Sequence, residues 1–160
     1  MTSPVLSVKD LRVNFPSEAG SVSAVRGVDF DLYPGRTLGI VGESGSGKSV
    51  TSMSVMGLLD DNAKVEGSIK LHGTELLGRS DEWMSDVRGA QIAMVFQDPF
   101  SSLDPKARVQ DSIAEPLIVH GLHKGSRDER IRELLGLVEL PAQMAQRYPH
   151  ELSGGQRQRV

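Results

Sequence analysis

The sequence predicts a mixed α/β fold with a β-rich first half and a helical second half. Over residues 4–33, apolar and polar residues alternate as they do in β-strands. A glycine-rich loop at 42–49 lies between a short apolar run and a segment with the apolar spacing of a helix. Beyond residue 105 the apolar spacing becomes helical and is accompanied by capping boxes. These features predict a sheet that leads into a phosphate-binding loop, followed by a group of helices.

Strands account for much of the first half. The runs 5–15 and 22–32 predict two strands joined by a turn at 20–21. A tight turn at 34–35 then leads to 38–41, which reads as a short buried strand.

The elements after the loop alternate in type. A packed helix is expected at 49–59, a strand at 65–72 and a compact apolar strand at 91–96. Between these two strands, Ser80 caps a short helix that Gly89 ends.

The second half is expected to be helical after a turn-rich segment at 97–105. Ser126 and Glu129 form a capping box before an apolar stripe with i, i+3, i+4, i+7 spacing. Prolines bracket another short helix at 141–149.

The loop fits the G-x-x-x-x-G-K-[ST] pattern of a phosphate-binding loop. Glycines allow tight turns and bring backbone N–H groups close to an anion. The lysine supplies a positive charge for the outer phosphates, the final serine hydroxyl can ligate Mg²⁺, and the following helix points its N-terminus at the anion. The sequence therefore predicts a nucleoside triphosphate site made of Gly42, Glu43, Ser44, Gly45, Ser46, Gly47, Lys48 and Ser49.

A second capping box, Ser153 with Gln156, predicts a helix that runs through Val160. Gly154 and Gly155 leave the N–H groups of its first turn accessible to an anion. Taken alone, the pattern also fits an ordinary well-capped helix. The phosphate loop upstream makes that reading less satisfactory.

Composition narrows the possible functions. At 160 residues the chain can form a domain with a core, and its net charge of −3 argues against a general nucleic-acid binder. The absence of cysteine excludes disulfides and thiolate sites, and the four histidines lack metal-ligand spacing. Neither a signal peptide nor an apolar run of roughly 20 residues is present. We expect a soluble chain whose membrane role would come through a partner.

The loop at 42–49, Gln97 and the segment 152–156 resemble, in this order, the Walker A loop, the Q-loop and the signature motif of ABC-type ATPases. The sequences at 42–49, 95–99 and 148–156 are similar to those of the ATPases of dipeptide, oligopeptide and nickel importers. The likeness covers nearly the whole chain.

The resemblance implies an α/β P-loop NTPase fold of the ABC type. It has an N-terminal antiparallel β subdomain, a partial core sheet and a helical subdomain, with the C-terminal core strands missing. The implied ranges are 1–98 for the β subdomain and partial core, 99–150 for the helical subdomain, and 151–160 for the signature motif and the start of its helix.

The resemblance also implies roles for individual residues. Phe15 falls where such proteins stack an aromatic ring on adenine, although an aromatic in a strand is usually core. Lys48 and Gln97 would support catalysis, and Ser49 and Gln97 would hold Mg²⁺; a lone glutamine before a turn is otherwise an ordinary loop residue. The residues that would face the ATP held by a partner subunit are Ser153, Gly154, Gly155 and Gln156.

The implied function is the ATP-binding subunit of an importer for peptides or similar small solutes. Such a subunit uses ATP and Mg²⁺ and lies peripherally on the cytoplasmic face of the membrane. Its partners are integral membrane permease subunits, a second ABC ATPase subunit and, indirectly, a solute-binding protein. Nucleic acid is not an expected partner.

The family's Walker B strand, D-loop and switch histidine do not occur before Val160. We therefore expect a fragment or truncated product that lacks a general base and hydrolyses no ATP by itself. Its strands at 38–41 and 91–96 would lack neighbours and favour aggregation. Two alternatives are a soluble ABC ATPase of DNA repair or translation and a remnant that does not hydrolyse ATP. The net negative charge and the importer-like sequence motifs argue against the first alternative.

Overall fold

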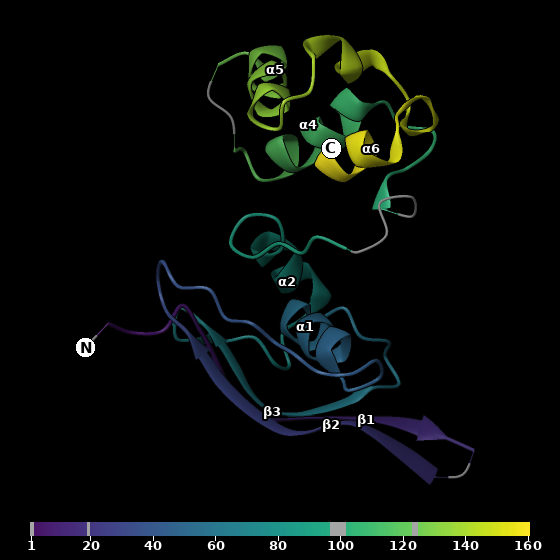
Figure 1. Ribbon diagram of the computed structural model, residues 1–160. Coiled ribbons are helices and arrows are strands. Elements are labelled where there is room, and N and C mark those ends of the chain that lie inside the picture. Colours follow the sequence, from purple (N-terminus) through teal and green to yellow (C-terminus); the bar gives the residue numbers. More distant parts are fainter. Residues whose placement is uncertain (1, 19, 97–101, 123–124) are drawn as a thin grey trace. The chain divides into compact units, whose positions relative to one another are not determined.

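The computed structural model describes residues 2–18, 20–96, 102–122 and 125–160. The chain forms two compact units, Met1–Ser85 and Asp86–Val160. The elements along the chain are β1 (Leu6–Ser17), β2 (Gly20–Leu32), α1 (Lys48–Met56), β3 (Lys64–Leu71), β4 (Thr74–Glu75), α2 (Asp81–Val87), α4 (Val109–Val119), α5 (Arg127–Leu137), the 3₁₀ helices η1 (Ala142–Gln146) and η2 (Pro149–Glu151), and α6 (Gly154–Arg159) (Figure 1).

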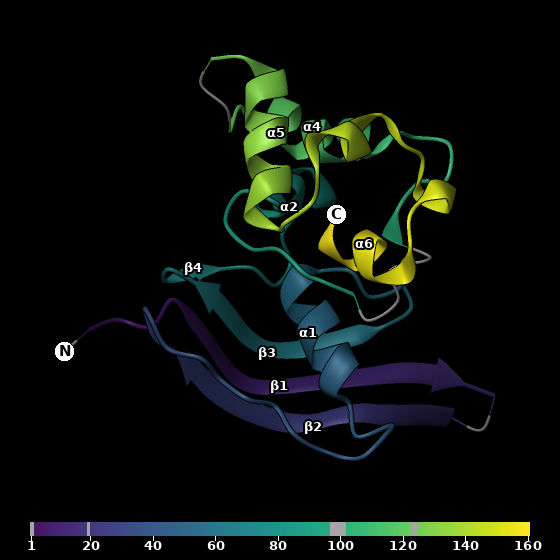
Figure 2. The ribbon, with the colours of Figure 1, turned by 45° about the horizontal axis from the view of Figure 1, so that its top comes forward.

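The first unit contains an antiparallel sheet whose strands lie in the order β2-β1-β3-β4 (Figure 2). The strands predicted at 5–15, 22–32 and 65–72 are thereby confirmed. β1 is paired on both sides, and its Val8 and Val13 are fully buried. Because alternate residues of a strand share a face, one side of this sheet carries the core.

The alternation in β1 changes phase near Asp10. Val8 and Leu11 are both fully buried although they are three residues apart, which an uninterrupted period of two cannot give. The pairing with both neighbouring strands shifts here, and Asp10 has a φ of +44°. On β3, a Cβ at Gly67 would lie 2.5 Å from the carbonyl oxygen of Asp10. A bulge in the central strand is thus accommodated by a glycine beside it, and apolar residues on both sides of the bulge stay in the core.

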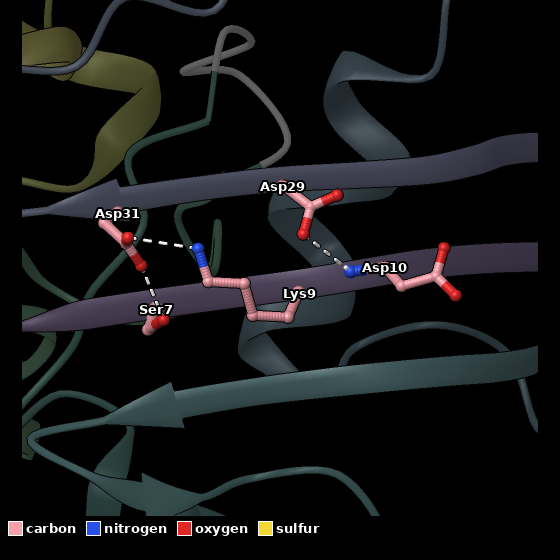
Figure 3. A network of polar contacts seen from close by, with 5 residues as sticks. All are labelled: Ser7, Lys9, Asp10, Asp29 and Asp31. Carbon is pink, nitrogen blue, oxygen red and sulfur yellow. Dashed lines mark hydrogen bonds and ion pairs between the residues drawn. The ribbon is translucent and has the colours of Figure 1, made fainter.

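Polar side chains join β1 and β2 around this bulge (Figure 3). Asp31 accepts hydrogen bonds from Ser7 Oγ at 2.5 Å and from Lys9 Nζ at 3.0 Å. Asp29 accepts one from the backbone N–H of Asp10 at 3.2 Å. The hydrogen bond from Ser7, followed by that from Lys9, holds the pKa of Asp31 below its ordinary value. These bonds help to fix the strand register where the ladder is irregular.

α1 contacts β2 and buries Thr51, Ser54, Val55 and Met56. It begins at Lys48 and ends at Gly57, whose φ of +61° cannot continue a helix. The helix predicted at 49–59 is confirmed, with an earlier end.

Two predicted strands do not form. No strand occurs at 38–41, where Val41 is 94% exposed. At 91–96, Ile92 makes only an isolated bridge, and Val95 is 92% exposed. An extended apolar run becomes a strand only when a neighbour accepts its backbone hydrogen bonds. Within the described residues, the sheet comprises β1 to β4 alone and offers these runs no neighbour.

The second unit is a helical cluster. The Ser126 side chain accepts a hydrogen bond from the Glu129 N–H, so the predicted cap of α5 is confirmed. α4 was foreseen only as part of a general helical pattern, and it retains its helix despite an internal Pro116. The helix expected between the prolines is the 3₁₀ segment η1. α4, α5 and η1 share a core made of Val109, Ala114, Leu117, Ile131, Leu135, Leu140, Ala145 and Leu152.

Candidate functional site

The glycine-rich loop ends where Gly47 meets the backbone of β2. Gly47 has a φ of +90°, and a Cβ there would lie only 2.5 Å from the carbonyl oxygen of Ala24. In the pairing of β1 with β2, Val25 faces Val13 and Ser23 faces Asn14, so Ala24 is an extra residue in its strand. A second bulge therefore directs a carbonyl oxygen at the phosphate loop. Only glycine satisfies both the backbone angle and the close approach.

Lys48 is the first residue of α1, and its side chain folds back over the loop. Its Nζ donates hydrogen bonds to the carbonyl oxygens of Gly42 at 2.8 Å and Glu43 at 2.6 Å, and to Ser46 Oγ at 3.4 Å. A Cβ at Gly42 would lie 2.5 Å from Ser46 Oγ. The loop thus closes around the lysine ammonium, and the positive charge is held by oxygen atoms of the loop itself.

The start of α1 is fixed by Thr51, a residue that the sequence analysis did not single out. Its backbone N–H and its Oγ1 both donate to the carbonyl oxygen of Gly47, at 2.8 and 2.9 Å, and the side chain is buried. Ser49 lies exposed in the first turn of the same helix. The first-turn N–H groups and the helix dipole favour an anion at this end.

An open pocket of about 670 Å³ lies between β2 and the loop. Its wall combines the loop residues Gly45 to Lys48 with the apolar side chains of Val28, Leu38 and Ile40. Leu38 and Ile40 belong to the run that forms no strand, and all three of these aliphatic side chains are partly exposed.

Phe15 lies on β1, half-buried and opposite Val22. It is two residues beyond Val13, whose partner Val25 follows the bulge that meets Gly47. The structure thus places Phe15 and the loop in one unit, with Phe15 on the part of the hairpin next to the bulge that meets Gly47.

The remaining predicted site residues are Gln97 and those of the signature motif. Gln97 falls outside the described residues. In the second unit, the Ser153 Oγ accepts from the Gln156 N–H at 3.3 Å and the Ser153 N–H donates to Gln156 Oε1 at 2.9 Å. The capping box predicted there is confirmed, and α6 begins at Gly154.

Two features are absent from the described part of the chain. No group of three or more His, Cys, Asp or Glu side chains is arranged to hold a metal ion. No helix there combines the length and apolar character needed to cross a membrane.

A glycine loop that closes around a lysine at the N-terminus of a helix defines the class of phosphate-loop nucleotide-binding proteins. Comparison with known sequences is more specific. The profile described as ABC transporter matches residues 25–160, and the chain belongs to this family.

The chain is similar to ATP-binding proteins of peptide transport. It is 50% identical to the oligopeptide transport ATP-binding protein OppD of Mycobacterium tuberculosis, over 99% of this chain and 26% of that protein. It is 47% identical to the dipeptide transport ATP-binding protein DppD of Bacillus subtilis, over 98% of this chain and 48% of that protein. The chain therefore spans between about a quarter and a half of the length of these relatives.

A solved structure shares the fold. A dimeric ATP-binding cassette in a post-hydrolysis state, bound to ADP and Pi, aligns with a TM-score of 0.84 at 27% identity. The alignment covers 96% of this chain and 66% of that one. The ABC ATPase fold predicted from the motifs is confirmed.

Proposed function

We propose that this chain is the nucleotide-binding part of an ABC importer subunit that couples ATP binding and hydrolysis to the uptake of peptides or similar small solutes. The observation that carries the nucleotide assignment is the closure of the loop around Lys48 at the start of α1. The solute class rests on the relatives, which are ATP-binding proteins of oligopeptide and dipeptide transport.

Residues 42–49 would hold the phosphates. Their backbone N–H groups would supply neutral donors, and Lys48 would exchange its two carbonyl partners for phosphate oxygens, a charge-assisted contact. Gly42 and Gly47 fit this role because a Cβ at either position would enter the cradle or strike β2. Phe15 would offer its ring to the adenine.

A divalent cation also fits this loop. Ser49 presents a hydroxyl in the first turn of α1, and Gln97 is proposed as a second oxygen ligand. When bound at these oxygens, Mg²⁺ would offset part of the negative charge of the phosphates. The chain's own contribution is to hold the phosphate chain in one orientation between Lys48 and Ser49.

The proposed partners follow from the signature motif and the relatives. Ser153, Gly154, Gly155 and Gln156 would face the ATP of a second ABC subunit, in line with the dimeric state of the similar cassette. Permease subunits would anchor the assembly peripherally at the cytoplasmic face of a membrane, and a solute-binding protein would deliver the solute.

Residues 1–160 by themselves are proposed to bind ATP without turning it over. Hydrolysis needs an oriented water and charge stabilisation from several sides. Lys48, Ser49 and Gln97 would supply only part of this set. The motifs found in the chain include no candidate for a general base.

Calorimetry with Mg-ATP tests the nucleotide site. Lys48→Ala removes a charge-assisted contact worth about 1.5–3 kcal/mol, so the affinity should fall by about tenfold or more. Lys70→Ala, which removes an exposed lysine of β3 in the same unit, should leave the affinity unchanged. Gly154→Asp should also bind normally, because that residue would serve the partner's nucleotide. Equal affinities in the wild type and Lys48→Ala would refute the site.

A further inference from the structure

Three flat side chains form a stack in the second unit. The guanidinium carbon of Arg108 lies 5.2 Å from the ring centroid of Tyr148. The rings of Tyr148 and His150 are stacked in turn, with centroids 5.6 Å apart and an interplanar angle of 10°. The stack connects the residue before α4 to the residues that precede the signature motif.

Hydrogen bonds reinforce the same connection. Arg108 Nη1 donates to Gln146 Oε1 at 3.0 Å and to the Gln146 carbonyl oxygen at 3.3 Å. Gln146 Nε2 donates to Gln110 Oε1 at 2.6 Å, and the Val109 N–H donates to the Arg147 carbonyl oxygen at 2.9 Å. The first turn of α4 is therefore joined to residues 146–148 by both side chains and backbone.

The residues between this stack and the signature motif are held by a hydrogen bond and by burial in the core. The Tyr148 N–H donates to Glu151 Oε2 at 2.7 Å, which closes the single turn of η2. The next residue, Leu152, is 4% exposed and belongs to the helical core. The residue after Leu152 is Ser153, the N-cap of α6.

We propose that Arg108 and Tyr148 are positioning residues that set the orientation of the capping box of α6. Only arginine can stack its planar group on a ring and donate two hydrogen bonds at the same time, because the ammonium of lysine is compact and lacks that plane. The contacts of Tyr148 with Arg108 and His150 are made by its ring. A phenylalanine at position 148 should therefore preserve the contacts made by the tyrosine ring. What the positioned motif would bind rests on the proposed function.

Amide hydrogen exchange of the purified chain, followed by NMR, tests this role at the Ser153 and Gln156 amides of the capping box. Arg108→Lys and Tyr148→Leu should each raise their exchange rates by about tenfold. Tyr148→Phe should leave the rates as in the wild type. Arg130→Lys is the matched control, because Arg130 is an arginine of α5 that forms an ion pair with Glu133, three residues along the same helix, at 2.7 Å.

The amides of α5 provide an internal reference in the same spectra. An increase confined to the capping box supports the proposal. A uniform increase that includes the Leu135 region would mean general destabilisation and would overturn it. Unchanged rates in Arg108→Lys, or a loss of protection in Tyr148→Phe, would also overturn it. Because Lys48 takes no part in this test, the ATP-binding result and the exchange result can fail separately.

Discussion

The strands of the antiparallel sheet and the apolar runs at 38–41 and 91–96 contain similar types of residue but have different conformations. In β1 and β3, apolar side chains such as Val8 and Ile69 are fully buried, and each strand is paired. In the runs, Val41 and Val95 are more than nine-tenths exposed. Both kinds of segment have the residue types of strands, so propensity alone does not separate them.

The difference lies in where the partner strands come from. β1 and β2 are joined by a short turn, so the chain supplies the partner locally at a small entropic cost. A run that leads into a phosphate loop and helix belongs to a parallel arrangement, whose neighbours come from distant sequence. The described residues contain no strand beside 38–41. In these segments, apolar side chains are therefore buried where the strand is paired and exposed where it is not.

The largest effect is expected at the centre of the paired sheet. Ile69→Ala removes a fully buried side chain and should lower the free energy of unfolding by about 2–5 kcal/mol. Val41→Ala removes a side chain that is 94% exposed and should change it by about 0.5 kcal/mol or less. Urea titrations of both variants compare the two regions directly. A large loss in Val41→Ala would show that 38–41 is packed in solution.

A smaller effect is expected where the bulge meets its neighbour. Gly67 has a φ of +110°, and Gly67→Ala places a Cβ 2.5 Å from the Asp10 carbonyl oxygen. The free energy of unfolding should therefore fall by about 2–4 kcal/mol. Gly73→Ala is the control, because its φ is +82° but no atom lies within 4 Å of the added Cβ. It should cost about 1 kcal/mol. Thermal unfolding measures the loss of stability in both variants. Equal losses would mean that backbone strain alone, without the close approach to Asp10, accounts for the effect.

The smallest effect concerns Glu75 at the edge of the sheet. Burial raises the pKa of Glu75, but hydrogen bonds from Ser68 and from the N–H groups of Ile69 and Leu77 outweigh it and hold the pKa below its ordinary value. The folded-state pKa is depressed, so its stabilising contribution is complete above about pH 4.3 and is lost as the pH falls through the folded pKa.

Glu75→Gln should therefore lower the free energy of unfolding by about 1 kcal/mol at pH 7, with little difference from the wild type near pH 3. Urea titrations at both pH values check this. Glu18→Gln, at an exposed position in the turn after β1, is the control. A difference that stays constant with pH would contradict the role of the ionised carboxylate.

Local signals predicted the elements that depend on local contacts. The caps at Ser126 and Ser153 were foreseen because each side chain bonds within one turn. The bulge at Asp10 was missed, although its signal is present in the sequence: the step from Val8 to Leu11 is three residues between buried positions. The strand at 38–41 was predicted wrongly because its residue types carry no information about whether a partner is available.

In the site, too, the features that depend on local contacts could be predicted and those that depend on distant residues could not. The loop at 42–49 follows from its pattern, because each fixed position acts within the loop itself. Ala24 could not be identified in this way, since its importance comes from a carbonyl oxygen that any residue type would supply. Thr51 was missed for a related reason: a threonine one turn into a helix is common, and only the structure shows both of its donors on Gly47.

The contact of Ala24 with Gly47 has a consequence for building chimeras. The hairpin and the phosphate loop touch through one carbonyl oxygen, so neither can be exchanged as an independent module. A hairpin taken from another cassette without an extra residue at position 24 would withdraw that oxygen or turn it away. A transplant that keeps this contact intact must therefore carry both strands of the hairpin together with the phosphate loop.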